Sequence, residues 1–195
     1  MKDRGQSAFG CLDIQIDSEW TSNNAETRAN RFSSDLLLPV SMFAPLAKGR
    51  PVTLETVRDL ASIFRMSRTA TAIRLVNYGS FPAMLIYYAE GQRKWFLRPS
   101  SDIPTSLWPS QRPEPLSLAA GLLAGKSDNV TGELRADHWF ENDGAAKYYV
   151  QESCFKTGAD SIVVMLWWEN EQQLIDIAEE DELRASRRSD QREEI

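Results

Sequence analysis

The chain has 195 residues, a formal net charge of −6 and 42% hydrophobic residues. This length and composition allow one ordinary domain or two small ones with a buried core, and they exclude a disordered chain. The acidic balance argues against broad attraction to nucleic acid or to an anionic membrane, and no apolar run has membrane-spanning length. The two cysteines, Cys11 and Cys154, match no metal-binding spacing. We therefore expect a soluble, cytoplasmic protein.

The first 50 residues contain one predicted helix. The polar residues 21–24 form a helix-capping signal. After them Ala25, Ala29, Phe32 and Leu36 recur at spacings of four, three and four, which predicts a buried helical stripe. Pro39 is expected to stop this helix.

The segment 51–79 predicts two short helices joined by a tight turn. Thr53 is a suitable cap for the first helix, which has an apolar face from Leu54 to Phe64. Ser67 is the expected cap of the second helix, and Gly79 ends it. The unit has the size of a helix-turn-helix.

From residue 83 onward the pattern favours strands. An apolar run, a Glu90-Gly91 turn and a second apolar run predict a β-hairpin. A proline-rich connector follows, and the mixed charges after Glu169 predict a solvated helix that frays. The other expected elements are a short helix within 116–123 and strands at 130–140, 148–155 and 161–168.

A short segment near the N-terminus carries a family resemblance. Residues 26–39, which contain Glu-x-x-Ala-Asn-x-Phe and Leu-Leu-Leu-Pro, resemble the ExxANxFAxxLLMP signature of the ImmA/IrrE metallo-endopeptidases. Ser33 stands where the family pattern has alanine, and Leu38 stands where it has methionine. The specific part of the resemblance is confined to this segment.

The resemblance implies a zinc site. In the family, a helix with the motif HExxH supplies two histidine ligands and a general base, and the glutamate of ExxAN supplies the third ligand. That residue is Glu26 here, and Asn30 and Ser33 would share its face of the helix. The chain has only one histidine, so it lacks the HExxH helix. We interpret it as incomplete, with the missing motif expected upstream of Met1. Zinc would belong to the complete protein. This chain alone is predicted to be inactive and to hold no tightly bound zinc.

The predicted fold class is α+β. The expected divisions are a remnant of a zincin-like peptidase domain at 1–50, a helix-turn-helix-like unit at 51–80 and a mixed α/β region at 81–170. At the level of strand count the last region is compatible with a GAF-like sensor, and a charged tail follows at 171–195.

Three functions follow from this interpretation. The first is part of a zinc metallo-endopeptidase that would cleave a helix-turn-helix repressor when complete. The second is a non-catalytic regulator or sensor that binds a repressor or a small ligand. The third is a DNA-binding regulator that uses residues 53–78, with Arg65, Arg68 and Arg74 on phosphates. A packing role is the preferred interpretation of this unit, because the acidic total charge, Glu55 and Asp59 dilute any basic stripe.

Two aromatic pairs and the one histidine could each have either a structural or a functional role. Trp167-Trp168 and Tyr87-Tyr88 could line a ligand pocket, but aromatic side chains in apolar strands are usually core residues. His138 lies in a strand-like run beside Trp139, where a hydrogen-bonded structural role is the simpler reading.

Overall fold

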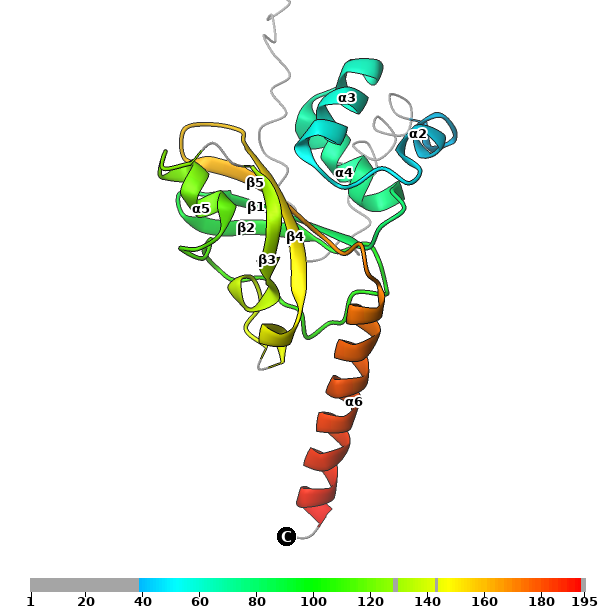
Figure 1. The fold of residues 1–195 in the computed structure, drawn as a ribbon, viewed down its shortest axis with the longest axis vertical. Helices are drawn as coiled ribbons and strands as arrows, with labels where there is room; N and C mark the ends of the chain where they lie inside the picture. The colour runs from blue at the N-terminus through cyan, green and yellow to red at the C-terminus, as the bar shows by residue number, and fades with distance from the viewer. Residues whose placement is uncertain (1–38, 128–129, 143, 194–195) are drawn as a thin grey trace, which may run out of the picture.

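The computed structural model describes residues 39–127, 130–142 and 144–193. This part of the chain forms five α-helices and one five-stranded sheet (Figure 1). No helix within it is long and apolar enough to cross a membrane. The helices are α2 (Val40–Ala47), α3 (Leu54–Phe64), α4 (Arg68–Tyr78), α5 (Leu118–Leu123) and α6 (Gln172–Glu193), and the strands are β1 (Ala83–Ala89), β2 (Gln92–Leu97), β3 (Thr131–Arg135), β4 (Tyr149–Lys156) and β5 (Ser161–Trp167).

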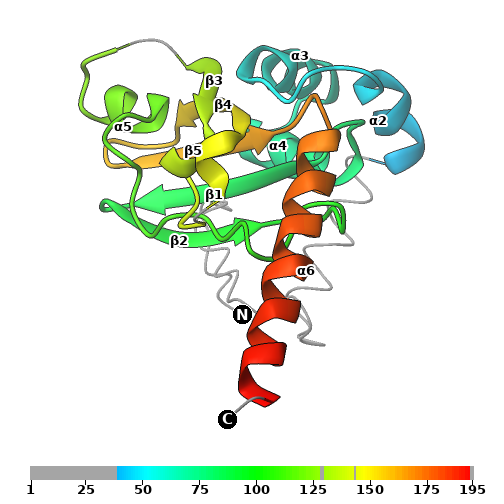
Figure 2. The ribbon, with the colours of Figure 1, turned by 60° about the horizontal axis from the view of Figure 1, so that its bottom comes forward.

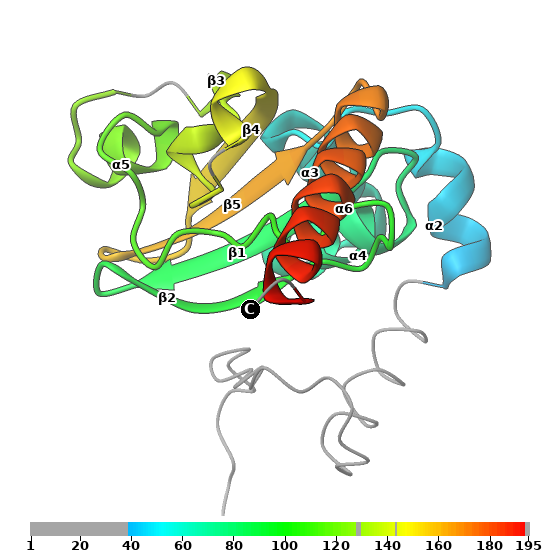
Figure 3. The same ribbon diagram turned by 90° about the horizontal axis from the view of Figure 1, so that it is seen from below.

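The sheet is antiparallel throughout, with the strand order β2-β1-β5-β4-β3. The helices α2, α3 and α4 lie on one face, while α5 and the first turns of α6 pack on the other (Figures 2 and 3). The predicted hairpin is confirmed as β1 and β2, which are joined at Glu90 and Gly91. Both turn residues have positive φ, 55° and 69°, as the type I′ hairpin turn requires. The fold is therefore α+β, as predicted.

The long apolar run of β1 is explained by cores on both faces of the sheet. Ala83 and Leu85 pack under α2, α3 and α4, whereas Met84, Ile86 and Tyr88 point into the opposite core. Because successive side chains of a strand alternate between faces, a strand that is buried on both faces is apolar at every position.

The helix pair at 51–79 is confirmed with its caps. The Thr53 side chain accepts a hydrogen bond from the Thr56 amide at 3.3 Å, and the Ser67 side chain accepts one from Ala70 at 3.2 Å. Arg65 takes a left-handed conformation (φ 53°) that ends α3, and Gly79 caps α4. Each N-terminal cap satisfies an amide that the helix itself leaves unpaired, and the N–H groups of Arg65 and Gly79 donate to helix carbonyls at the other ends.

Several element predictions needed correction. The strand expected at 130–140 ends at Arg135, and the 3₁₀ helix η1 (Ala136–His138) follows it. The helix α2 was not predicted, because Pro45 lies inside it. The predicted tail helix exists as α6, but it is anchored, because Leu174 and Ile177 are buried in the core on the face of the sheet that α5 also covers. The helix predicted at 25–36 lies outside the described residues.

Candidate functional site

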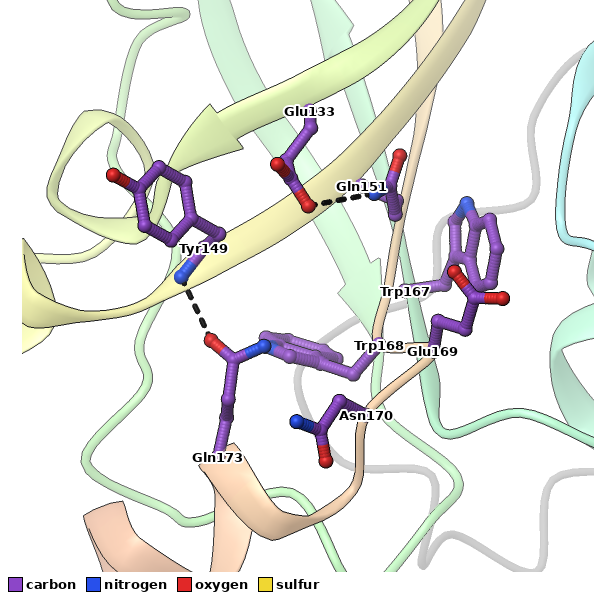
Figure 4. Close-up of a pocket in the computed structure, with 8 residues that line it drawn as sticks. All are labelled: Glu133, Tyr149, Gln151, Trp167, Trp168, Glu169, Asn170 and Gln173. Atoms are coloured by element: carbon purple, nitrogen blue, oxygen red, sulfur yellow. Dashed lines mark hydrogen bonds between the residues drawn. The ribbon is translucent and has the colours of Figure 1, made fainter.

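A pocket of about 200 Å³ lies where β3, β4 and the end of β5 meet the start of α6 (Figure 4). The register of the sheet builds one wall of it, because Glu133 pairs with Gln151 and Gln151 pairs with Trp167. Figure 4 shows Trp168 between this row and the side chain of Gln173. The eight lining residues are Glu133, Tyr149, Gln151, Trp167, Trp168, Glu169, Asn170 and Gln173.

Hydrogen bonds hold the polar part of the pocket in place. The side-chain amide of Gln151 donates a hydrogen bond to the Glu133 carboxylate at 2.9 Å, which links β4 to β3. The Tyr149 backbone N–H donates to the Gln173 side-chain oxygen at 2.8 Å, which links β4 to α6. The side-chain oxygen of Asn170 accepts from the amide of Gln172 at 3.0 Å, at the start of α6. The pocket is therefore fixed at the junction of three strands and a helix.

Trp167 and Trp168 are the buried members of the pocket, at 6% and 1% exposure. The Trp167 ring packs against Phe81 with 5.0 Å between centroids, and the Trp168 ring stacks on Phe140 at 6.0 Å. Their indole Nε1 atoms are buried and find no hydrogen-bond acceptor among the described residues. A buried donor without an acceptor costs about 1–3 kcal/mol, so two of them on one pocket require an explanation.

A third buried indole shows the usual arrangement. The Nε1 of Trp139 donates to the carboxylate of Glu152 at 3.0 Å. Glu152 also accepts from the amides of Leu118 and Ala119, at 3.2 and 2.7 Å, at the start of α5. Burial raises the pKa of Glu152, and these three donors partly offset that effect. The Glu152 cluster, made of these four residues, is closed and has a structural role.

The pocket differs from the Glu152 cluster in charge and access. Glu133 and Glu169 are exposed, and none of the eight lining residues is lysine, arginine or histidine. The lining also contains no serine, cysteine or threonine that could act as a nucleophile. Across the described residues, no group of three histidine, cysteine, aspartate or glutamate residues could hold a metal ion. The groups exposed in this lining are therefore polar side chains, two carboxylates and the half-exposed ring of Tyr149.

The predicted zinc-site residues, Glu26, Asn30 and Ser33, lie outside the described residues. His138 is found in η1 and not in a strand, which corrects the strand-like context predicted for it.

The three arginines that were considered as possible DNA contacts do not share one kind of surface. Arg65 and Arg68 are exposed at the turn between α3 and α4, and the Arg68 guanidinium lies over the Phe155 ring at 5.3 Å. Arg74 is only 6% exposed and lies over the ring of Tyr78 at 5.1 Å. The helix α4 also buries Thr71, Ala72, Leu75 and Val76. Most of α4 therefore faces the protein, which favours a packing role for this helix pair.

Of the two aromatic pairs singled out in the sequence, only Trp167-Trp168 lines the pocket. Tyr88 is a core residue whose hydroxyl donates to the Ser110 carbonyl at 2.9 Å, and Tyr87 stacks on Trp95 at 5.3 Å. The polar residues of the pocket were missed by sequence reasoning. Glu133, Tyr149 and Gln151 occupy alternate positions of two neighbouring strands, a signal that becomes useful only when the register of the strands is known.

Comparison of the chain with protein-family models finds no match, and a search of curated proteins finds none either.

Proposed function

We propose that residues 39–193 form the non-catalytic binding region of an ImmA/IrrE-type regulatory protein, with the pocket beside Trp167 and Trp168 as its recognition site. The observation that carries this proposal is the pair of buried indole donors with no acceptor among the described residues. Because both Nε1 atoms are buried, a bound partner would have to displace the groups that cover them before it could offer an acceptor and remove this cost. The helix pair α3–α4 would be the helix-turn-helix-like unit, used for packing, and the sheet region would be the GAF-like sensor.

Hydrolysis would require more than this chain offers. By resemblance Glu26 would be the third zinc ligand, but the family site also needs two histidines at a spacing of four residues. The one histidine of the sequence, His138, lies in η1. Glu26 and His138 as the available zinc ligands do not fit a family-type zinc site, so the two-histidine motif would have to come from outside this sequence. Cleavage of a repressor is proposed only for a protein that contains that motif.

The partner proposed for the binding region is a helix-turn-helix repressor, as the resemblance implies. The test uses the full chain and the helix-turn-helix repressors of the source organism, expressed one at a time, with binding measured by titration calorimetry. We expect one repressor to bind and the double variant Trp167→Phe/Trp168→Phe to weaken that binding. The control is Trp108→Phe, because Trp108 is 52% exposed and lies outside the pocket.

Two results would contradict the proposal. The absence of binding to every repressor would remove the regulatory function. Retention of equimolar zinc by the purified chain after dialysis, measured by mass spectrometry, would contradict a purely non-catalytic role.

A further inference from the structure

Two exposed apolar side chains lie on the short helix α2, and a third lies on α3. Met42 and Leu46 are 61% and 45% exposed, and Ile63 is 58% exposed. Met42 and Leu46 are four residues apart, so they share one side of α2, next to the buried side formed by Phe43 and Ala47. The helix α2 lies at the outer edge of the layer formed by α2, α3 and α4 (Figures 1 and 3). This side of α2 is therefore left largely uncovered by the described residues.

Contacts between α2 and α3 bring the three side chains to one border. Ile63 precedes Phe64, and the Phe64 ring contacts the Phe43 ring with 5.6 Å between centroids. Asp59 lies one turn before Ile63 on α3, and its carboxylate pairs at 2.6 Å with Arg50, which follows α2. The side of α3 that carries Ile63 therefore borders the end of α2. The α2–α3 apolar face consists of the three exposed side chains Met42, Leu46 and Ile63.

The chain segment that directly precedes α2 is itself predicted to be amphipathic. Residues 25–36 lie outside the described part of the chain, and their sequence predicts a helix whose apolar stripe ends in Phe32 and Leu36. A helix of this length is only marginally stable in water, and in a protein most of its stability comes from packing of its apolar side. The segment therefore requires an apolar surface to pack on.

The link between the segment and α2 is short. Only residues 37–39 separate the predicted helix from Val40, the first residue of α2. Pro39 has an extended backbone (φ −56°, ψ 130°), so the two helices do not continue as one. Two helices joined by about 2–5 residues pack antiparallel as a hairpin. The tether also holds the segment beside α2 at an effective concentration of about millimolar, which favours it over a separate chain.

We propose that residues 25–36 fold back on α2 as an antiparallel helical hairpin, with Phe32 and Leu36 packed on the α2–α3 apolar face. The apolar stripe of the segment and the exposed side chains of this face then cover each other. The pairing does not depend on the binding function proposed for the pocket.

The hairpin has a consequence for the residue that resembles a zinc ligand. Glu26, Asn30 and Ser33 lie about 100° around the predicted helix from its apolar stripe. When the stripe is packed, these three side chains stay at the flank of the helix and remain accessible. Glu26 is thereby held at a fixed place beside α2, open to a group that would supply the two histidines.

The test measures whether the α2–α3 apolar face is covered in the full chain. The methyl groups of methionine and isoleucine are labelled with ¹³C, and a neutral gadolinium chelate in the solvent broadens the signals of those that it can approach. Met42 and Ile63 are the reporters, and Ile175 on α6 is the reference, because it is 50% exposed. We expect both reporter signals to be broadened much less than the reference signal. Met42→Leu, Ile63→Val and Ile175→Val assign the three signals.

A double variant removes the apolar contact from the segment alone. Phe32→Ser/Leu36→Ser should abolish the protection, so that the reporter signals become broadened as strongly as the Ile175 signal. The signals of the buried residues Met84 and Met165 show whether the sheet remains folded in the variant. The comparison of reporter and reference signals in the unsubstituted chain does not depend on the folding of this variant.

A matched control removes two large apolar side chains from the same N-terminal part of the chain, outside the stripe. Ile14→Ser/Ile16→Ser should leave the protection of both reporters unchanged. An equal loss of protection in this control would overturn the inference.

Three further outcomes would overturn it. Equal broadening of reporter and reference signals in the unsubstituted chain would show that the face is uncovered. Protection that persists in Phe32→Ser/Leu36→Ser would assign the cover to another part of the chain, and protection that disappears on dilution would assign it to a second copy. Because no repressor is present in these measurements, their result is separate from that of the test of the proposed function.

Discussion

Two regions of the molecule combine tryptophan with glutamate, and they do so in opposite ways. In the Glu152 cluster the carboxylate is fully buried and accepts three hydrogen bonds, one of them from Trp139. In the pocket, the carboxylates of Glu133 and Glu169 are exposed, while the buried indoles of Trp167 and Trp168 have no acceptor among the described residues. A buried polar group that is fully paired contributes to folding, whereas a buried donor without an acceptor costs free energy. The comparison therefore separates a fully paired buried cluster from a region whose buried donors are unpaired within the described residues.

The largest effect is expected at the buried carboxylate. Glu152→Ala removes the acceptor of three buried or partly buried donors, so it should lower the free energy of unfolding by more than about 3 kcal/mol. Glu133→Ala removes an exposed carboxylate and should change the stability by less than about 0.5 kcal/mol. Urea denaturation of both variants measures the difference. Equal losses would contradict the distinction between the two regions.

The second largest effect is expected at the buried tryptophans, whose substitutions should lower the free energy of unfolding by different amounts. Trp139→Phe and Trp168→Phe both shrink a ring that is almost completely buried. Only Trp139→Phe also deprives Glu152 of a donor, so it should be more destabilising than Trp168→Phe by about 1–3 kcal/mol. Thermal and urea unfolding of the two variants provides the measurement. If Trp168→Phe were the more destabilising of the two, the Trp168 indole would have a hydrogen-bond acceptor in the folded protein, and the contrast with Trp139 would be wrong.

The pH dependence of stability should report a smaller contribution from Glu152. Because burial raises its pKa in the folded protein, the folded state holds this proton more tightly than the unfolded state. The contribution is constant below the ordinary glutamate pKa, and stability falls as the pH rises from there through the raised pKa. Glu152→Gln should lack this decline. Unfolding curves of both proteins across mildly acidic pH isolate the effect, and identical slopes would contradict it.

The smallest effect is expected on the surface. Glu180 accepts hydrogen bonds from Lys147 at 2.9 Å and from Tyr148 at 3.2 Å, and the bond from Lys147 lowers its pKa. The resulting stability is present above the ordinary glutamate pKa and is lost as the pH falls through the lowered pKa. Lys147→Met should cost less than about 1 kcal/mol and should matter even less in high salt. A larger loss that persists in high salt would mean that this contact acts like the Glu152 cluster.

Local features of the sequence were predictable because their causes are local. The caps Thr53 and Ser67 and the Glu90-Gly91 turn act within a few residues, so the helix pair and the hairpin follow from them. The apolar alternation of residues 130–140 did not show where the strand ends. That end is set by pairing with β4, which stops at Arg135 and Tyr149, and the Ala136 amide then bonds to the Tyr148 carbonyl at 2.8 Å.

The sequence by itself determined the α+β composition, the single histidine and the segment that resembles ImmA/IrrE. It also marked Trp167-Trp168 as either core or pocket, without choosing between them. The tertiary structure showed that these residues are both, because they are buried and also line a pocket. The choice depended on strand register, which brings Glu133, Gln151 and Trp167 from three strands into one row. Residues far apart in the chain meet only through this pairing, so no local pattern could have identified the pocket.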